Sequence, residues 1–87
     1  MPKDINKSVN FKVSLTLGKE VFKTEGETLL EALDKLKPNK IVSKGIIKVK
    51  YGKLETERVY HVIQVRRLIG NQMSRIIIAK ALQGFLK

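Results

Sequence analysis

The chain has 87 residues, a formal net charge of +10 and no cysteine. This length suits one small domain with a single hydrophobic core, and the lack of cysteine excludes disulfides and thiolate metal sites. The first residues lack the apolar core of a secretory signal, and no run of about 18 apolar residues occurs, so we expect a cytoplasmic protein that does not span a membrane.

Residues 1–8 are polar and charged, and they predict a loose arm ahead of a single domain at residues 9–87. From residue 10 to residue 17 apolar and polar residues alternate strictly, which is the period of a half-buried strand. The apolar side of this strand consists of Phe11, Val13, Leu15 and Leu17.

Gly18-Lys19 has the form of a two-residue hairpin turn, because glycine adopts the positive φ that such turns require. Residues 20–25 then return as a second strand. With this turn Leu15 faces Phe22, and directly paired residues share one side of a sheet. The predicted outer side of the hairpin carries Lys12, Ser14, Val21 and Lys23.

A short helix is predicted after the first hairpin, at residues 29–37. Thr28 and Glu31 have the spacing of a capping box, in which each side chain bonds an amide that the first helical turn leaves free. Leucine and alanine residues give the helix one apolar side, and Pro38 ends it. The link at residues 38–44 is too short to separate two domains.

A second hairpin repeats the first, because Gly52-Lys53 follows Gly18-Lys19 after 34 residues. Residues 45–51 form its first predicted strand, and residues 54 to about 65 form the second. The opposed pairs on one side are Lys50 with Glu55 and Lys48 with Glu57. Opposite charges in register support the assigned turn. The chain is therefore predicted to contain two hairpin-and-helix units, residues 9–37 and 44–86.

The segment from Arg66 to Gly70 fits a strand, a loop or a helical turn, and we place the end of the strand near Arg66. Asn71 is a suitable N-cap for a last helix. The predicted apolar side of this helix consists of Met73, Ile76, Ile77, Ala81, Leu82 and Phe85. The predicted exposed side consists of Gln72, Arg75, Ala79, Gln83 and Lys87.

These elements predict an α+β fold with the order β-β-α-β-β-α. Two hairpins form one four-stranded antiparallel sheet, and two helices pack on one of its faces. The other face stays open to solvent, which antiparallel sheets tolerate. The residues expected on this open face are Lys12, Ser14, Lys23, Lys48, Lys50 and His61.

The sequence contains no motif of a catalytic, cofactor or metal site, so we expect a protein that is not an enzyme and binds no cofactor or metal. His61 is the single histidine, and an exposed strand position is the simpler interpretation of it. Glu55 and Glu57 share a strand face, but each has a lysine opposite. The six glycines are isolated and lack the signature of a phosphate-binding loop.

Positive charge is concentrated in the second part of the chain. Residues 35–87 hold thirteen Lys or Arg against two acids, whereas residues 1–34 hold five lysines against six acids. Such a field attracts polyanions, and we expect DNA or RNA. Few aromatic residues are free of the core, so phosphate contacts are favoured over base stacking. The candidate contacts are Lys44, Lys48, Lys50, Lys53, Arg58, Arg66, Arg67, Arg75 and Lys80.

Other interpretations fit the same residues. In one, an accessory protein of the kind found in phages and mobile elements assembles through Met73 to Leu86, as a homodimer or against a larger protein. In another, the last helix lies on an anionic membrane, which we rank last because this helix has three cations and no Trp or Tyr. A lysine-rich surface that serves solubility alone carries the same charge.

Overall fold

The computed structural model describes residues 10–86, so the predicted arm at residues 1–8 and Lys87 lie outside the described residues. The elements in this range are β1 (Phe11–Leu17), β2 (Glu20–Gly26), α1 (Leu29–Asp34), β3 (Gly45–Tyr51), β4 (Leu54–Tyr60), α2 (Val62–Gly70) and α3 (Gln72–Phe85). The predicted α+β order is confirmed, and the range contains one helix more than the sequence predicts.

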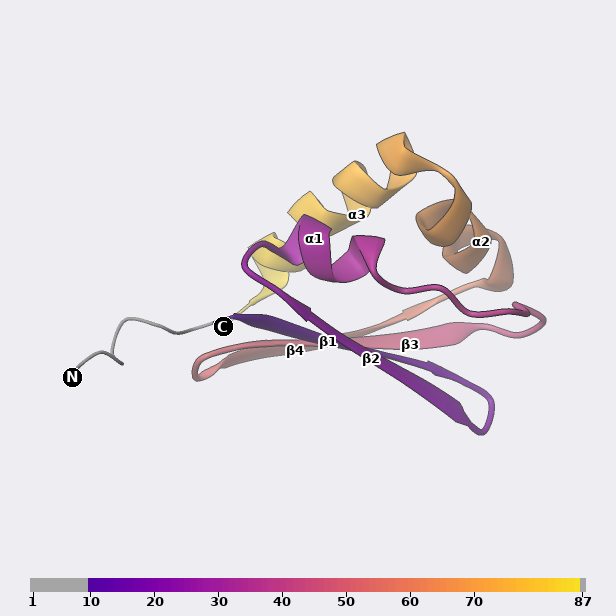
Figure 1. Ribbon diagram of the computed structural model, residues 1–87, viewed down its shortest axis with the longest axis horizontal. Helices are drawn as coiled ribbons and strands as arrows, with labels where there is room; N and C mark the ends of the chain where they lie inside the picture. Colours follow the sequence, from indigo (N-terminus) through magenta and orange to yellow (C-terminus); the bar gives the residue numbers. More distant parts are fainter. Residues whose placement is uncertain (1–9, 87) are drawn as a thin grey trace.

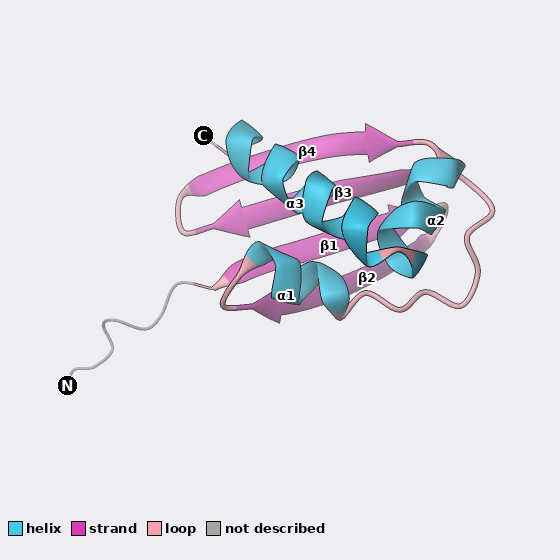
Figure 2. Ribbon diagram, turned by 90° about the horizontal axis from the view of Figure 1, so that it is seen from above, coloured by secondary structure: helices cyan, strands magenta, loops and turns pink. Residues whose placement is uncertain are grey.

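The four described strands form one antiparallel sheet in the order β2-β1-β3-β4 (Figure 2). The two hairpins lie side by side, and their first strands, β1 and β3, pair with each other in the centre. Both hairpins have the predicted register, with Leu15 opposite Phe22 and Lys50 opposite Glu55. The alternation of each strand therefore decides which side chains reach the open face.

Glycine occupies the first position of each hairpin turn. Gly18 and Gly52 have φ angles of 62° and 63°, and no described residue other than glycine has a positive φ. A positive φ at the first turn position alone is the pattern of a type II′ turn, whose twist matches that of the paired strands. The two Gly-Lys turns thus hold both hairpins in register.

All three described helices cover one face of the sheet, and no helix of this range lies on the other face (Figure 1). The core between the two layers is apolar. Its largest fully buried side chains are Val13, Leu15, Ile47 and Val49 from the strands and Leu29, Leu33, Leu36, Val65, Leu68 and Leu82 from the helical layer. No polar or charged side chain among residues 10–86 is buried, so any polar chemistry of this part of the chain takes place at the surface.

α1 begins at the predicted cap and ends earlier than predicted, at Asp34 instead of residue 37. The hydroxyl of Thr28 accepts a hydrogen bond from the Glu31 amide at 3.0 Å. The Glu31 carboxylate accepts from the amide of Glu27 at 2.9 Å, one residue before the expected partner. Leu36 still reaches the core after the helix has ended, because its amide bonds the carbonyl of Leu33 at 3.1 Å.

β4 ends at Tyr60, so the prediction of a strand to about residue 65 is wrong. α2 occupies this segment, and Val65 and Leu68 on its inner side are fully buried. His61 is the N-cap of α2 and not a residue of the open sheet face; its amide donates to the Gln64 side-chain oxygen at 3.0 Å. The β-branched residues of this segment favour a strand by composition. Val65 and Leu68 are three residues apart, however, and this spacing places them on the same side of a helix.

α3 is turned about its axis relative to the prediction. Ala79 and Leu82 are buried, whereas Met73 and Ile77, which the sequence places in the core, are 70% and 64% exposed. Two features explain the rotation. α2 already supplies apolar side chains to the core, and Arg75 points into the helical layer, where it bonds the end of α2. α3 therefore packs on α1 and α2 through the side that carries Arg75, Ala79 and Leu82.

Candidate nucleic-acid interface

The nine candidate contact residues do not lie on one side of the molecule. Lys48 and Lys50 lie on β3 and point to the open face of the sheet, whereas Arg67 and Lys80 lie in the helical layer. Lys53 lies in the β3–β4 turn and Lys44 just before β3. The side chains of these six residues are exposed. These cations all belong to the basic second part of the chain, but the fold places them on different sides of the molecule.

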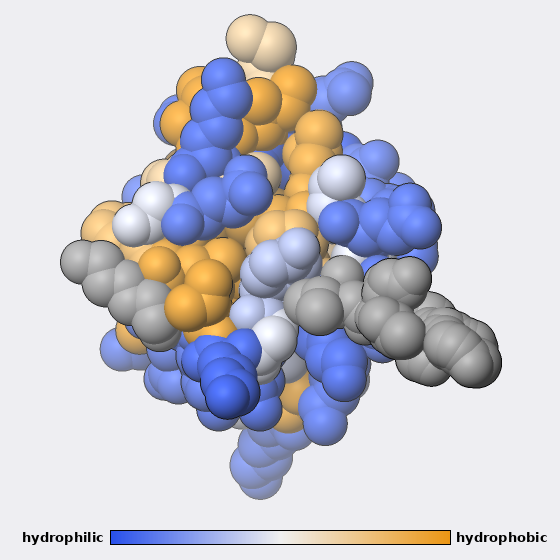
Figure 3. Space-filling model, turned by 90° about the vertical axis from the view of Figure 1, so that its left-hand side faces the viewer, coloured by the Kyte–Doolittle hydropathy of each residue, from blue (hydrophilic) through white to orange (hydrophobic). Residues whose placement is uncertain are grey.

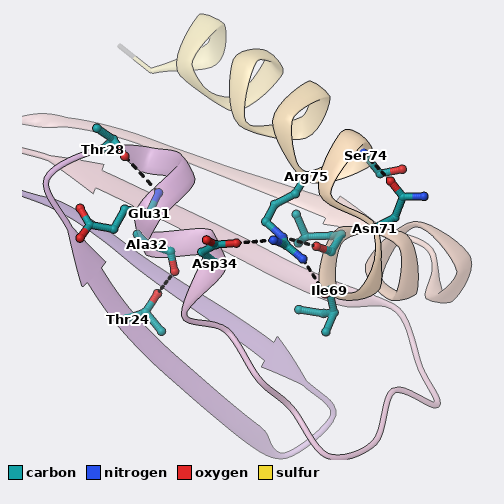
Figure 4. Close-up of polar contacts among 10 residues, drawn as sticks. Thr24, Thr28, Glu31, Ala32, Asp34, Ile69, Asn71, Ser74 and Arg75 are labelled. Carbon is teal, nitrogen blue, oxygen red and sulfur yellow. Dashed lines mark hydrogen bonds and ion pairs between the residues drawn. The ribbon is translucent and has the colours of Figure 1, made fainter.

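Arg75 is held inside the helical layer and is not available for a phosphate (Figure 4). Its Nε donates to the carbonyl of Leu68 at 2.9 Å and its Nη2 to the carbonyl of Ile69 at 2.7 Å. Its Nη1 forms an ion pair with Asp34, and only 12% of the Arg75 side chain is exposed. The carbonyls at the end of α2 have no helical partner and carry the negative end of the helix dipole, so a cation stabilises them. Arg75 therefore joins all three helices.

Arg66 and Arg58 also make contacts within the protein. The Nε and Nη2 atoms of Arg66 donate to the carbonyl of Ile41 at 3.3 and 3.2 Å, which fastens the link between α1 and β3. The guanidinium carbon of Arg58 lies 4.0 Å from the ring centroid of Phe85, a cation–π contact. Phe85, which the sequence places on the apolar side, is 43% exposed. These two arginines tie outer segments to the fold.

The open face has a regular composition that the three strand registers determine. From β2 to β4 its rows are Val21, Thr16, Ile46 and Val59; then Lys23, Ser14, Lys48 and Glu57; then Glu25, Lys12, Lys50 and Glu55. The four lysines lie on β2, β1 and β3, and the three acids lie on the two edge strands. Positive charge is therefore concentrated in the middle of the face.

Lys12 and Lys50 stand directly opposite each other on the two central strands. The acids next to them in the same row are directed to other groups. Asn10 Nδ2 donates to Glu25 at 2.9 Å, and Lys48 Nζ lies 3.2 Å from Glu55. Within residues 10–86 no carboxylate oxygen lies within 4.0 Å of the ammonium group of Lys12 or Lys50. Glu25 and Glu55, which the register places beside Lys12 and Lys50, therefore do not form ion pairs with these two lysines.

An open hollow of about 580 Å³ lies on this face of the sheet. It is lined by Lys12, Val13, Ser14, Lys23, Thr24, Glu25, Lys48 and Lys50. Its donors are ammonium and hydroxyl groups, which bind phosphate oxygens. No histidine or cysteine lines the hollow, so its side chains suit the binding of an anion better than proton transfer near neutral pH.

Lys12 and Lys23 belong to this cluster, although they are not among the nine contacts predicted from the sequence. Their predicted place on the open face is confirmed, but they lie in residues 1–34, which carry a small net negative charge. The hairpin register was the signal that could have found them. It brings these two lysines beside Lys48 and Lys50, which follow much later in the chain.

Three further findings concern the part of the chain that the structure describes. It contains no group of three His, Cys, Asp or Glu side chains placed to hold a metal ion. None of its helices has both the length and the apolar character needed to cross a bilayer. Comparison of the chain with protein-family models, curated proteins and solved structures gives no match.

Proposed function

We propose that this protein binds nucleic acid through the phosphate backbone, with the open face of the sheet as the main contact surface. One observation carries this proposal: four lysines, Lys12, Lys23, Lys48 and Lys50, lie on three neighbouring strands of a face that no described helix covers. The formal net charge of +10 attracts polyanions over longer distances. Lysines on a rigid sheet then provide the short-range phosphate contacts.

The composition of the open face favours phosphates over bases. None of the twelve side chains in its three rows is aromatic, whereas single-strand binders usually present rings on which bases stack. Lysine binds phosphate as a point charge and does not select a base at that contact. We therefore infer binding with little sequence preference.

The acids of the open face restrict the path of the nucleic acid. Glu55 and Glu57 both lie on the edge strand β4 and repel phosphates, while β1 and β3 present lysines and Ser14. The backbone should follow β2, β1 and β3 and avoid β4. Lys44, Lys53, Arg67 and Lys80 lie outside this path and contribute mainly to long-range attraction.

Binding measured against salt concentration tests this proposal. Fluorescence anisotropy with duplex and single-stranded DNA and RNA probes should show an affinity that falls steeply with salt. If four lysines each neutralise one phosphate of a duplex, log K falls against log salt concentration with a slope of about −3.6. Between about 50 and 200 mM salt the affinity then falls about 100-fold. Absence of binding at low salt would remove nucleic acid as the partner.

Paired charge removals locate the surface. Lys12→Gln with Lys50→Gln should lower the magnitude of the salt slope by about 1.8, because two phosphate contacts are lost. The control, Arg67→Gln with Lys80→Gln, removes the same charge from the helical layer. It should weaken binding only slightly. A larger loss in the control than in the sheet variant would move the interface to the helices.

A second function, assembly through α3, is favoured by a different observation. Met73 and Ile77 are 70% and 64% exposed, and apolar surface is gathered on the helical layer in the upper part of Figure 3. Exposed apolar side chains on one helix are typical of protein contacts. Sedimentation equilibrium tests this function: a dimer that Met73→Gln with Ile77→Gln disrupts supports it, and a monomer at all concentrations contradicts self-association.

A further inference from the structure

We propose that the hollow in the open face is a discrete phosphate-binding site. The phosphate group lies between the ammonium groups of Lys12 and Lys50, with Lys23 and the hydroxyl of Ser14 as further donors. This site deepens the proposed function, in which the bound phosphate belongs to a nucleic-acid backbone. It rests on the proposed function only for that source of the phosphate. The site itself follows from the arrangement of the four side chains around the hollow.

Lys12 and Lys50 form a like-charged pair on the two central strands. A solvated sheet face needs polar side chains, and threonine or glutamine would supply them without repulsion. Here Lys12 and Lys50 are directly paired across β1 and β3, where like charges destabilise the pairing of the strands. An anion placed between them converts this repulsion into two attractions, since each ammonium group then faces an opposite charge.

The spacing of the strands brings the two lysines within reach of one phosphate. Neighbouring strands lie about 4.8 Å apart, so two lysines that are directly opposed on one face start close together. Their long, flexible stems allow both ammonium groups to contact the same phosphate. Ser14 is next on the same side of β1, and Lys23 is opposite Ser14 on β2. Four donors from three strands therefore line one hollow.

The two acids nearest to the pair interact with other residues. Glu25 lines the hollow, and a free carboxylate there would repel a phosphate. It accepts a hydrogen bond from Asn10 instead, and Glu55 at the other end of the row pairs with Lys48. Both carboxylates that the register places beside the pair are thus held by other groups. This arrangement leaves Lys12 and Lys50 with positive charge to offer a ligand.

The site predicts an unusual combination of effects on stability. Lys12→Thr removes the repulsion and should raise the melting temperature in sodium chloride, whereas most substitutions lower it. The same change removes a phosphate donor, so it should weaken phosphate binding about tenfold. A ligand that binds only the folded chain raises the melting temperature. Phosphate should therefore stabilise the wild type much more than the variant.

The test compares sodium phosphate with sodium chloride at equal ionic strength, using the full chain. Thermal unfolding and ¹⁵N NMR titration are measured for the wild type, Lys12→Thr, Lys50→Thr and the control Lys44→Thr, whose lysine lies outside the hollow. The expected result is a saturating change in the NMR chemical shifts of the residues that line the hollow. The wild type and Lys44→Thr should show this change, whereas Lys12→Thr and Lys50→Thr should not. Equal effects of phosphate and chloride, or an unchanged response in Lys12→Thr, would overturn the site.

The same titration with AMP and with a 12-base-pair duplex distinguishes the sources of phosphate. A duplex that binds more tightly than AMP, and loses affinity in Lys12→Thr, supports both the site and the proposed function. A duplex that binds no better than AMP, while phosphate still shifts the residues of the hollow, keeps the site and contradicts the nucleic-acid function. If Lys12→Thr binds the duplex as tightly as the wild type does, the phosphate site is contradicted. Nucleic-acid binding would then take place on another surface of the protein.

Discussion

Arg75 in α3 forms an ion pair with Asp34 at the end of α1, and the two residues are 41 positions apart in the sequence. The same guanidinium donates to two carbonyls at the end of α2. These carbonyls are partly buried and have no helical partner of their own. Arg75 therefore stabilises the packing of the helical layer, which explains why a residue predicted to contact phosphate is only slightly exposed.

Arg75→Met should lower the free energy of unfolding by about 2–4 kcal/mol, because charged hydrogen bonds are lost and two partly buried carbonyls are left without donors. Asp34→Asn should lower it by less than about 1 kcal/mol, since the Asp34 side chain is 55% exposed and its charge is screened by solvent. Urea denaturation measures both. A cost for Asp34→Asn as large as that for Arg75→Met would show that the ion pair, and not the carbonyl capping, is the main contribution.

Two glycine-to-alanine changes should act in opposite directions. At Gly26 a Cβ atom would lie 2.8 Å from the backbone nitrogen of Ala32, so Gly26→Ala should destabilise the fold by about 1–3 kcal/mol. At Gly84, within α3, nothing lies within 4 Å of the added atom, and Gly84→Ala should stabilise by about 0.5–1 kcal/mol. Thermal melts of the two variants and the wild type give the comparison. The prediction fails if both changes shift the melting temperature the same way.

The cap of α3 depends on a single side chain. Asn71 is in an extended conformation, and its side-chain oxygen accepts a hydrogen bond from the Ser74 amide at 3.0 Å. Asn71→Ala should cost about 1 kcal/mol of unfolding free energy, whereas Asn71→Asp keeps the acceptor and should be nearly neutral. Chemical denaturation checks both values. Equal losses in the two variants would mean that the contact is not the origin of the effect.

Burial raises the pKa of the Tyr60 phenol above its ordinary value, and the nearby charge of Arg58 acts in the opposite direction. The folded state thus favours the protonated phenol. This contribution to stability is fully present below about pH 10, the pKa of an unfolded tyrosine, and is lost as pH rises through the folded pKa. Unfolding free energies of the wild type should therefore fall more steeply above about pH 10 than those of Tyr60→Phe. Identical pH profiles would contradict a shifted phenol.

The hairpins could be predicted from the sequence because short-range features determine them. Strict alternation from Phe11 to Leu17 and the two Gly-Lys turns are enough to assign the strand pairs and the residues of the open face. The caps at Thr28 and Asn71 also depend on neighbours within three residues. Local patterns of this kind change little when the rest of the chain packs against them.

The helical layer could not be predicted in the same way, because its arrangement depends on contacts between distant segments. Val62, Ile63 and Val65 favour a strand by composition, and the burial of Val65 and Leu68 against the rest of the core selects the helix instead. The orientation of α3 depends on Arg75 and on the carbonyls of α2. The lysine cluster of the open face cannot be found from charge counted along the chain for a related reason, because the sheet brings Lys12 and Lys23 beside Lys48 and Lys50 by register.

The opposition of Lys12 and Lys50 also has a consequence for the folding pathway. Each hairpin closes through a two-residue turn, but β1 and β3 meet only after residues 18–44 have been looped out. The repulsion thus acts in the long-range contact between the two hairpins, whose closure loses more chain entropy than a two-residue turn, and not within either hairpin. Screening should accelerate the formation of this contact. The refolding rate of the wild type should rise with ionic strength, and Lys12→Thr should refold faster with less dependence on salt.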